Sequence, residues 1–172
     1  MKILLDEIGI KKSLTRICYE IIEKNRDINN LVLLGIKNRG DILAERIKNR
    51  IEQLENIQIP LEVIDITYYR DDIDKNNFID VKENEFKTNL TDKTVIIVDD
   101  VLYTGRTIRA ALDAILNVAR PAKIQLACLI DRGHRELPIR ADFIGKNIPT
   151  SRDENIEVHL KEFDNEECVL II

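Results

Sequence analysis

Strands that alternate with helices predict an α/β fold with a mainly parallel central sheet flanked by helices. Short apolar runs at residues 31–36 and 94–98 are typical of parallel strands buried on both faces. Amphipathic stretches lie between such runs, and this alternation forms βαβ units with right-handed crossovers. The length of 172 residues is that of one domain. We therefore expect a single domain over residues 1–172.

The first elements follow from apolar spacing. Residues 7–25 carry apolar side chains at intervals of three and four, which predicts a helix with Asp6 as its N-cap. The run at 31–36 predicts a buried strand, and a second amphipathic stretch from 41 to 54 predicts the helix that follows it.

The central part of the chain continues the alternation. Residues 61–69 predict a strand, whereas residues 70–92 are polar, rich in acids and predict an exposed excursion. The clearest strand is 94–98, followed by a helix over 107–118 and a strand over 123–130. The tail adds two short predicted strands near 156–161 and 168–172.

Composition excludes several classes of protein. Hydrophobic residues make up 44% of the chain and charged residues 33%, which is a globular balance and not that of a disordered chain. No apolar run approaches the ~20 residues that span a bilayer, and acid at Asp6 interrupts the start before a secretory signal forms. The three cysteines are far apart, which favours a reducing cytoplasm. Two histidines and no CxxC pair predict no zinc site.

Charge is unevenly distributed along the chain. The net charge is -5, yet residues 11–26 and 132–152 are both rich in lysine and arginine, while residues 153–167 are strongly acidic. Two basic segments on an acidic chain are compatible with a local surface that binds anions. Solvated helix and loop faces are the alternative interpretation.

The segment from 95 to 107 carries the strongest functional pattern. An apolar strand runs into two adjacent carboxylates, Asp99 and Asp100, and a loop with threonines and a glycine then enters a helix. Free backbone N–H groups at a helix N-terminus favour an anion, whereas paired carboxylates suit hydroxyl groups or a hydrated cation. The pattern predicts a phosphorylated sugar, with its phosphate at 104–107 and its diol at the two aspartates.

An apolar strand followed by two aspartates also occurs as a Walker B segment, which requires a phosphate loop elsewhere. Gly35 and Gly40 have the glycine spacing of such a loop, but Asp41 and Ile42 follow where lysine and a hydroxyl residue are needed. An acid at that position repels phosphate. The sequence therefore argues against a P-loop nucleotide hydrolase.

On these motifs the chain resembles the type I phosphoribosyltransferases, and among them the bifunctional attenuators of the pyrimidine operon that are also uracil phosphoribosyltransferases. Residues 95–107 are similar to the family's motif for 5-phosphoribosyl-1-pyrophosphate (PRPP). Further similar segments follow in the same order at 13–17, 35–40, 65–72 and 131–150. The resemblance implies a single phosphoribosyltransferase domain with a flexible loop or arm at about 70–92 and a small hood formed by the terminal segments.

The resemblance implies that uracil and PRPP react to give UMP and pyrophosphate, with Mg²⁺ carried by PRPP near Asp99 and Asp100. These two aspartates would hold the ribose hydroxyls, and Arg39 and Arg70 would act on the leaving pyrophosphate. Residues 35–40 resemble the pyrophosphate loop, where members often have a non-proline cis peptide, here at Lys37-Asn38. The residues implied in binding PRPP or nucleotide are Lys37, Asn38, Arg39, Gly40, Asp99, Asp100, Val101, Leu102, Tyr103, Thr104, Gly105, Arg106 and Thr107.

Three tyrosines are notable beside this pattern. Tyr68 and Tyr69 precede Arg70 where the family's catalytic loop begins, and packing of an edge strand is the other interpretation of these tyrosines. Tyr103 stands where several purine-handling relatives have an acid. The resemblance therefore names no general base in this chain.

A second function is implied by the same resemblance. Proteins of this group bind a stem-loop in the pyr leader mRNA when a uridine nucleotide, UMP or UTP, is bound. The expected mode is phosphate contact with recognition of unpaired bases. The implied RNA-binding residues are Thr15, Arg16, Tyr19, His134, Arg135, Arg140 and Lys146, with Tyr19 standing where the group commonly has histidine.

Two alternatives remain open at this stage. The chain would be a pyrimidine-salvage enzyme without RNA binding, or a PRPP-binding regulator with negligible catalysis. The resemblance also implies a homodimer or a higher homo-oligomer, and no membrane partner.

Overall fold

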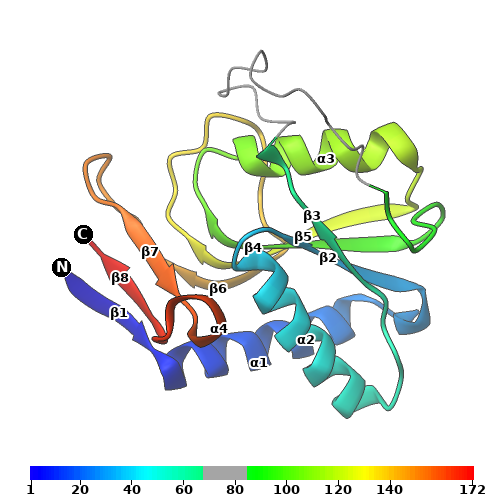
Figure 1. The fold of residues 1–172 in the computed structure, drawn as a ribbon, viewed down its shortest axis with the longest axis horizontal. Helices are drawn as coiled ribbons and strands as arrows, with labels where there is room; N and C mark the ends of the chain where they lie inside the picture. Colours follow the sequence, from blue (N-terminus) through cyan, green and yellow to red (C-terminus); the bar gives the residue numbers. More distant parts are fainter. Residues whose placement is uncertain (68–84) are drawn as a thin grey trace.

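The computed structural model describes residues 1–67 and 85–172, which form a five-stranded sheet with helices on both faces and a smaller sheet beside it (Figure 1). In chain order the elements are β1 (Lys2–Asp6), α1 (Glu7–Lys24), η1 (Ile28–Asn30), β2 (Leu31–Ile36), α2 (Gly40–Glu55), β3 (Leu61–Ile64), β4 (Thr94–Leu102), α3 (Arg106–Val118), β5 (Lys123–Asp131), β6 (Phe143–Asn147), β7 (Ile156–His159), α4 (Lys161–Asp164) and β8 (Cys168–Ile171). The predicted α/β class with a parallel central sheet is confirmed.

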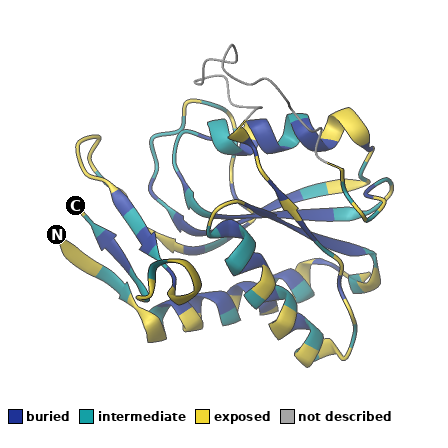
Figure 2. Ribbon diagram, in the orientation of Figure 1, coloured by how far each residue is buried: buried dark blue, intermediate teal, exposed yellow. Residues whose placement is uncertain are grey.

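The large sheet has the strand order β3-β2-β4-β5-β6, with every pair parallel. Helices α1 and α2 lie on one face and α3 on the other (Figure 1). Alternate residues of β4 serve the two faces, since Ile96 packs with α1 and α2 while Val95 and Ile97 pack with α3. This two-sided burial, visible in Figure 2, explains why the strands read as continuous apolar runs.

The helices begin where local chemistry predicts. The Asp6 carboxylate accepts a hydrogen bond of 2.8 Å from the backbone N–H of Gly9, which confirms Asp6 as the N-cap of α1. Helix α2 ends at Asn56, whose φ of 52° is left-handed. Helix α3 follows Gly105, whose φ of +95° is a conformation that glycine adopts without strain.

Two strand boundaries differ from the prediction. Strand β3 ends at Ile64 and not at residue 69, because the Asp65 carboxylate accepts from both the N–H (3.1 Å) and the hydroxyl (2.7 Å) of Thr67 and starts a turn. Strand β4 continues through Asp99 and Asp100, since its pairing with β5 extends to Leu102 opposite Asp131. The predicted loop 99–107 is therefore shorter, and Asp99 and Asp100 belong to the strand.

The smaller sheet is the predicted hood. It has the antiparallel order β1-β8-β7, so that the two chain termini lie side by side (Figure 1). Strands β7 and β8 confirm the two tail strands, whereas β1, β6 and the short helix α4 were not predicted. The predicted excursion at 70–92 falls largely outside the described residues. No helix in the described ranges has the length and apolar character to cross a bilayer.

Candidate active site

Three strands of the large sheet, β2, β4 and β5, lie next to one another and send their loops from the same carboxyl edge. Ligands of open α/β sheets bind at such an edge. The loop after β2 is pressed against β4, because a Cβ on Gly40 would lie 2.6 Å from the carbonyl oxygen of Val98 and 3.2 Å from Cα of Asp99. This contact places the predicted pyrophosphate loop beside the predicted diol site.

The aspartate pair lies near the end of β4, with Asp99 buried and Asp100 half-buried. Asp99 is 6% exposed, and its Oδ1 accepts a hydrogen bond of 3.0 Å from the N–H of Asp100. Oδ1 of Asp100 in turn accepts one of 2.7 Å from the N–H of Val101. Burial raises the pKa of Asp100, although Val101 N–H and Arg39 favour its charged form. Hydroxyl donors or a hard cation would satisfy these oxygens, so the pair fits both ribose hydroxyls and Mg²⁺.

The loop of the predicted phosphate site lies between β4 and α3. The carbonyl oxygen of Thr104 accepts from the N–H groups of Glu136 (3.0 Å) and Leu137 (3.3 Å), and Arg106 forms a 3.0 Å ion pair with Glu136. The segment after β5 thus supports this loop from the far side. A cavity of about 250 Å³ opens at the N-terminus of α3 and is lined by Asp99 and by the continuous stretch Val101, Leu102, Tyr103, Thr104, Gly105, Arg106, Thr107 and Ile108.

The pyrophosphate loop has the implied backbone. The peptide Lys37-Asn38 is cis, and Arg39 has a φ of 54°. Lys37 and Asn38 are exposed, Arg39 is half-buried and Gly40 is buried. The N–H of Lys37 donates to the carbonyl oxygen of Ile64 at 3.0 Å, which joins this loop to the end of β3.

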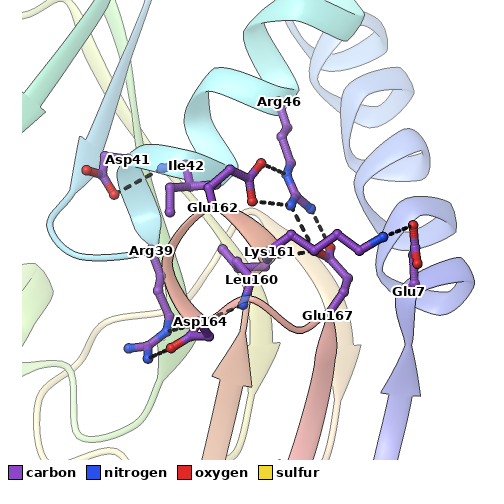
Figure 3. Close-up of polar contacts among 10 residues, drawn as sticks. All are labelled: Glu7, Arg39, Asp41, Ile42, Arg46, Leu160, Lys161, Glu162, Asp164 and Glu167. Atoms are coloured by element: carbon purple, nitrogen blue, oxygen red, sulfur yellow. Dashed lines mark hydrogen bonds and ion pairs between the residues drawn. The ribbon is translucent and has the colours of Figure 1, made fainter.

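Arg39 is held by the hood, a contact that sequence reasoning missed. Its Nε and Nη2 lie 3.0 and 2.6 Å from the two carboxylate oxygens of Asp164 in α4 (Figure 3), and its guanidinium lies 5.0 Å from the ring centroid of Phe163. The hydrogen bond to Asp164 raises the pKa of Arg39, and the same bond lowers the pKa of Asp164. The two residues are 125 positions apart in the sequence. The only indication of the contact in the sequence is the acidic composition of residues 153–167.

A second arginine fastens the same segment. Arg46 of α2 donates to Glu162 at 2.9 and 2.6 Å and to Glu167 at 2.5 and 2.9 Å (Figure 3). The N–H of Leu160 donates to Asp164 at 2.8 Å, so the carboxylate that holds Arg39 is itself fixed. The hood is therefore bound to the start of α2 through charged side chains.

An aromatic and cationic cluster closes the side of the site after β5. The guanidinium of Arg132, which is 5% exposed, lies 4.1 Å from the ring centroid of Tyr103, and His134 meets the same ring edge-on at 6.1 Å. Nε2 of His134 lies 2.6 Å from the carbonyl oxygen of Thr150, so it acts as the donor. Arg135 donates to the carbonyl oxygen of Tyr103 at 2.7 Å and pairs with Asp131.

The predicted RNA-binding residues divide into two groups. Arg16 and Tyr19 are exposed on α1 and Thr15 lies half-buried beside them; all three line a shallow hollow of about 760 Å³ along this helix. Nη2 of Arg16 donates to the carbonyl oxygen of Ile144 in β6 at 3.1 Å. Exposed Lys146 of β6 donates to the carbonyl oxygen of Leu4 at 3.2 Å, and exposed Arg140 precedes β6. His134 and Arg135 instead bond to backbone carbonyls in the cluster around Tyr103.

Three predicted site residues cannot be placed. Tyr68, Tyr69 and Arg70 lie outside the described residues, so the assignment of Arg70 to catalysis stays a prediction.

Comparison with known proteins assigns the chain to a family. Residues 2–162 match the model of the phosphoribosyl transferase domain. A bifunctional protein PyrR of Fusobacterium nucleatum is 74% identical over 173 residues, covering 100% of this chain and 98% of that protein. A bifunctional protein PyrR of Staphylococcus aureus is 56% identical over 171 residues, covering 99% and 98%.

Solved structures show the same fold at low identity. The hypoxanthine phosphoribosyltransferase of Trypanosoma cruzi has a TM-score of 0.75 at 18% identity, covering 99% of this chain and 95% of that one. A hypoxanthine-guanine phosphoribosyltransferase of Bacillus anthracis has a TM-score of 0.74 at 18% identity, covering 100% and 97%. By the matching family model and these full-length relatives, the chain belongs to the phosphoribosyltransferase family and groups within it with the bifunctional PyrR proteins.

Proposed function

We propose that this chain is a uracil phosphoribosyltransferase and a uridine-nucleotide-dependent, RNA-binding regulator that attenuates transcription of the pyrimidine operon. One observation supports the enzyme above all. Gly40 brings the pyrophosphate loop within contact of β4 at Asp99, so that three sites for the parts of one PRPP molecule lie along a single sheet edge. The full-length likeness to bifunctional PyrR proteins supports the regulatory half.

The reaction transfers ribose phosphate from pyrophosphate to N1 of uracil. The bond from the anomeric carbon to pyrophosphate breaks with its electron pair on the leaving oxygen, N1 bonds to that carbon, and the N1 proton leaves to solvent. Mg²⁺ carried by PRPP would supply charge neutralisation, with Asp99 and Asp100 as the oxygen ligands that fit it.

The protein's own residues act by position and charge. Asp99 and Asp100 orient the ribose hydroxyls, and the N–H groups at the start of α3 hold the 5-phosphate. Arg39 stabilises negative charge on the leaving pyrophosphate, and Arg70 joins it from the loop. Two of the five N–H donors of Arg39 engage Asp164, and three remain for pyrophosphate.

Steady-state synthesis of UMP from uracil and PRPP tests the enzyme. The Asp100→Asn variant should lose kcat/KM by roughly 10- to 150-fold, the worth of a hydrogen bond to a charged group. Full activity in that variant would refute the assignment of the diol site.

Binding of the pyr leader stem-loop tests the regulator. Affinity should rise on addition of UMP or UTP and fall steeply with salt, because phosphate contacts release counterions. Arg140→Ala should weaken binding with PRPP turnover retained, whereas the matched control Arg152→Ala removes an exposed charge from the same basic segment and should bind normally. Equal RNA affinity with and without nucleotide would refute the coupling, whereas undetectable leader binding alongside robust UMP synthesis would favour a salvage enzyme without RNA binding.

The two groups of RNA-binding candidates predict different phenotypes. Arg16, Tyr19, Arg140 and Lys146 are exposed and act on RNA directly. Arg135 is bonded into the loop beside Tyr103, so its substitution should impair RNA binding and catalysis together. We further propose one domain over residues 1–172, a homodimer or higher homo-oligomer, and a cytoplasmic location, in keeping with three free cysteines.

A further inference from the structure

A cluster of metal-binding side chains lies in the hood, in the β7–β8 hairpin that also carries Asp164. His159 ends β7 and Cys168 begins β8, and the two are direct cross-strand partners. Glu166 reaches the same point from the connecting segment, where its carboxylate contacts Nδ1 of His159. One ligand atom from each of these three residues lies within 4.8 Å of the others. The number of histidines and the cysteine spacing predicted no zinc site, and no sequence motif marks this cluster, because strand pairing creates it.

The donor set and its spacing suit zinc. Imidazole nitrogen, carboxylate oxygen and thiolate sulfur are the zinc ligands of proteins, with bonds of about 2.0–2.3 Å, so tetrahedral ligands lie roughly 3.3–3.8 Å apart. The three ligand atoms lie within 4.8 Å of one another, and the Glu166 carboxylate contacts Nδ1 of His159 directly. Metal binding therefore requires this pair to separate to about 3.3 Å and the more widely spaced atoms to close by up to about 1 Å. Glu166 is an exposed side chain on a turn, with 57% of its surface accessible, and it supplies that freedom.

A fourth residue completes the arrangement. Oε2 of Glu157 lies 3.2 Å from Nε2 of His159, on the ring nitrogen that faces away from Glu166. A carboxylate that accepts from the second N–H of a histidine fixes the ring for metal binding at the other nitrogen. Lys161, the lysine of the connecting segment, is bonded to Glu7 of α1 at 2.6 Å, and its charge is thus drawn toward that helix.

We propose that His159, Glu166 and Cys168 form a binding site for one zinc ion at the root of the hood, with Glu157 as the outer residue that orients His159 and water in the fourth position. Binding releases the thiol proton and the Nδ1 proton to solvent. The segment between His159 and Cys168 carries the carboxylates that hold Arg39 and Arg46. A metal at its two ends would hold that segment in its observed shape.

Cobalt(II) titration of the full-length, reduced, metal-free protein tests this site without PRPP, so the outcome is independent of the proposed enzyme. We expect one equivalent to produce a thiolate-to-cobalt charge-transfer band, which zinc then removes by displacement. Cys168→Ser should abolish the band, and His159→Gln and Glu157→Gln should each weaken cobalt binding by about tenfold or more. Glu55→Gln, which changes an exposed acid at the end of α2, is the control and should bind cobalt as the unmodified chain does.

Circular dichroism of each variant shows whether it is folded, and thermal melts give a second measure of metal binding. Zinc should raise the melting temperature of the unmodified chain but not that of Cys168→Ser, because only a bound ligand stabilises the folded state. The proposal is overturned if no charge-transfer band forms, if the band survives in Cys168→Ser, or if His159→Gln and Glu157→Gln bind cobalt with unchanged affinity.

Discussion

Replacing Gly40 by alanine tests how the two halves of the active site are aligned. The added Cβ would lie 2.6 Å from the carbonyl oxygen of Val98, whereas ordinary contact begins at 3.4 Å. The start of α2 and the end of β4 must therefore separate by about 0.8 Å. Both partners at this contact are backbone, so no side-chain rotation relieves it.

The separation has two measurable consequences. Overpacking of this kind costs about 1–3 kcal/mol of unfolding free energy, which is a fall of roughly 2–12 °C in melting temperature for a chain of this size. The pyrophosphate loop would also move away from Asp99 by a distance close to the 1 Å that costs about 10²-fold in rate. Thermal melts and steady-state UMP synthesis measure the two effects.

Gly9→Ala provides a matched control. A Cβ at Gly9 meets side chains and no backbone, namely Leu5 at 3.0 Å and the Asp6 carboxylate at 3.2 Å, and alanine in a helix gains up to ~1 kcal/mol over glycine. This variant should retain its stability and its activity. Unchanged melting and unchanged kcat/KM in Gly40→Ala would refute the close approach, and lost stability with full activity would refute its role in alignment.

Three further variants probe charge at the site. Burial raises the pKa of Asp100, so the ionised carboxylate lowers the stability of the folded chain at neutral pH. Asp100→Asn should therefore raise the urea midpoint near pH 7, and this gain should shrink as the pH falls toward about 4, where the carboxyl is protonated. Asp164→Asn should raise the KM for PRPP roughly fivefold, which is equivalent to about 1 kcal/mol. Because asparagine has the same shape as aspartate, the melting temperature should stay nearly unchanged. An unchanged KM would exclude Asp164 from positioning Arg39. Arg46→Met leaves the Glu167 side chain, which is 5% exposed, without its cation. The variant should lose about 3 kcal/mol of unfolding free energy, measured by urea denaturation. A loss below about 1 kcal/mol would show that the hood is held by other contacts.

The sequence predicts the interior of the large sheet well because burial there is continuous. All six residues of β2 are buried, and such a run has few alternatives to a two-sided strand. The edges are harder. Strand β1 is mostly exposed or half-buried, and β6 ends in two exposed residues, so neither carries the apolar pattern on which the prediction depends.

The two corrected boundaries have opposite causes. At Asp65 the carboxylate accepts from the N–H and hydroxyl of Thr67, which starts a turn and ends β3 early. This local effect was missed because the neighbouring residues are strong strand formers. At Asp99 and Asp100 the charges suggest a loop, but pairing with β5 carries the strand on to Leu102. Tertiary pairing thus overrides the local preference of aspartate against strands.

The site residues show the same division between local and distant information. The aspartates, Gly105 and the cis peptide at Lys37-Asn38 all lie in contiguous motifs, so these residues could be found without knowledge of the fold. Asp164 could not be found in this way, because its relation to Arg39 exists only when the hood folds over α2.

This division has a physical consequence for the enzyme. The proposed diol and phosphate sites are fixed by backbone, through the β4–β5 pairing and the contact at Gly40, and backbone contacts cannot be exchanged for a ligand. Arg39 is fixed by a partly exposed carboxylate, and an ion pair of that kind contributes little more than ~1 kcal/mol. A pyrophosphate group carries more negative charge than Asp164, so it can draw the guanidinium toward itself without breaking the sheet. Leu160 and Val169 of the hood are buried in the same apolar core as α1 and α2, so the Arg39–Asp164 pair, and not the hood as a whole, is the contact that can differ between bound and unbound states.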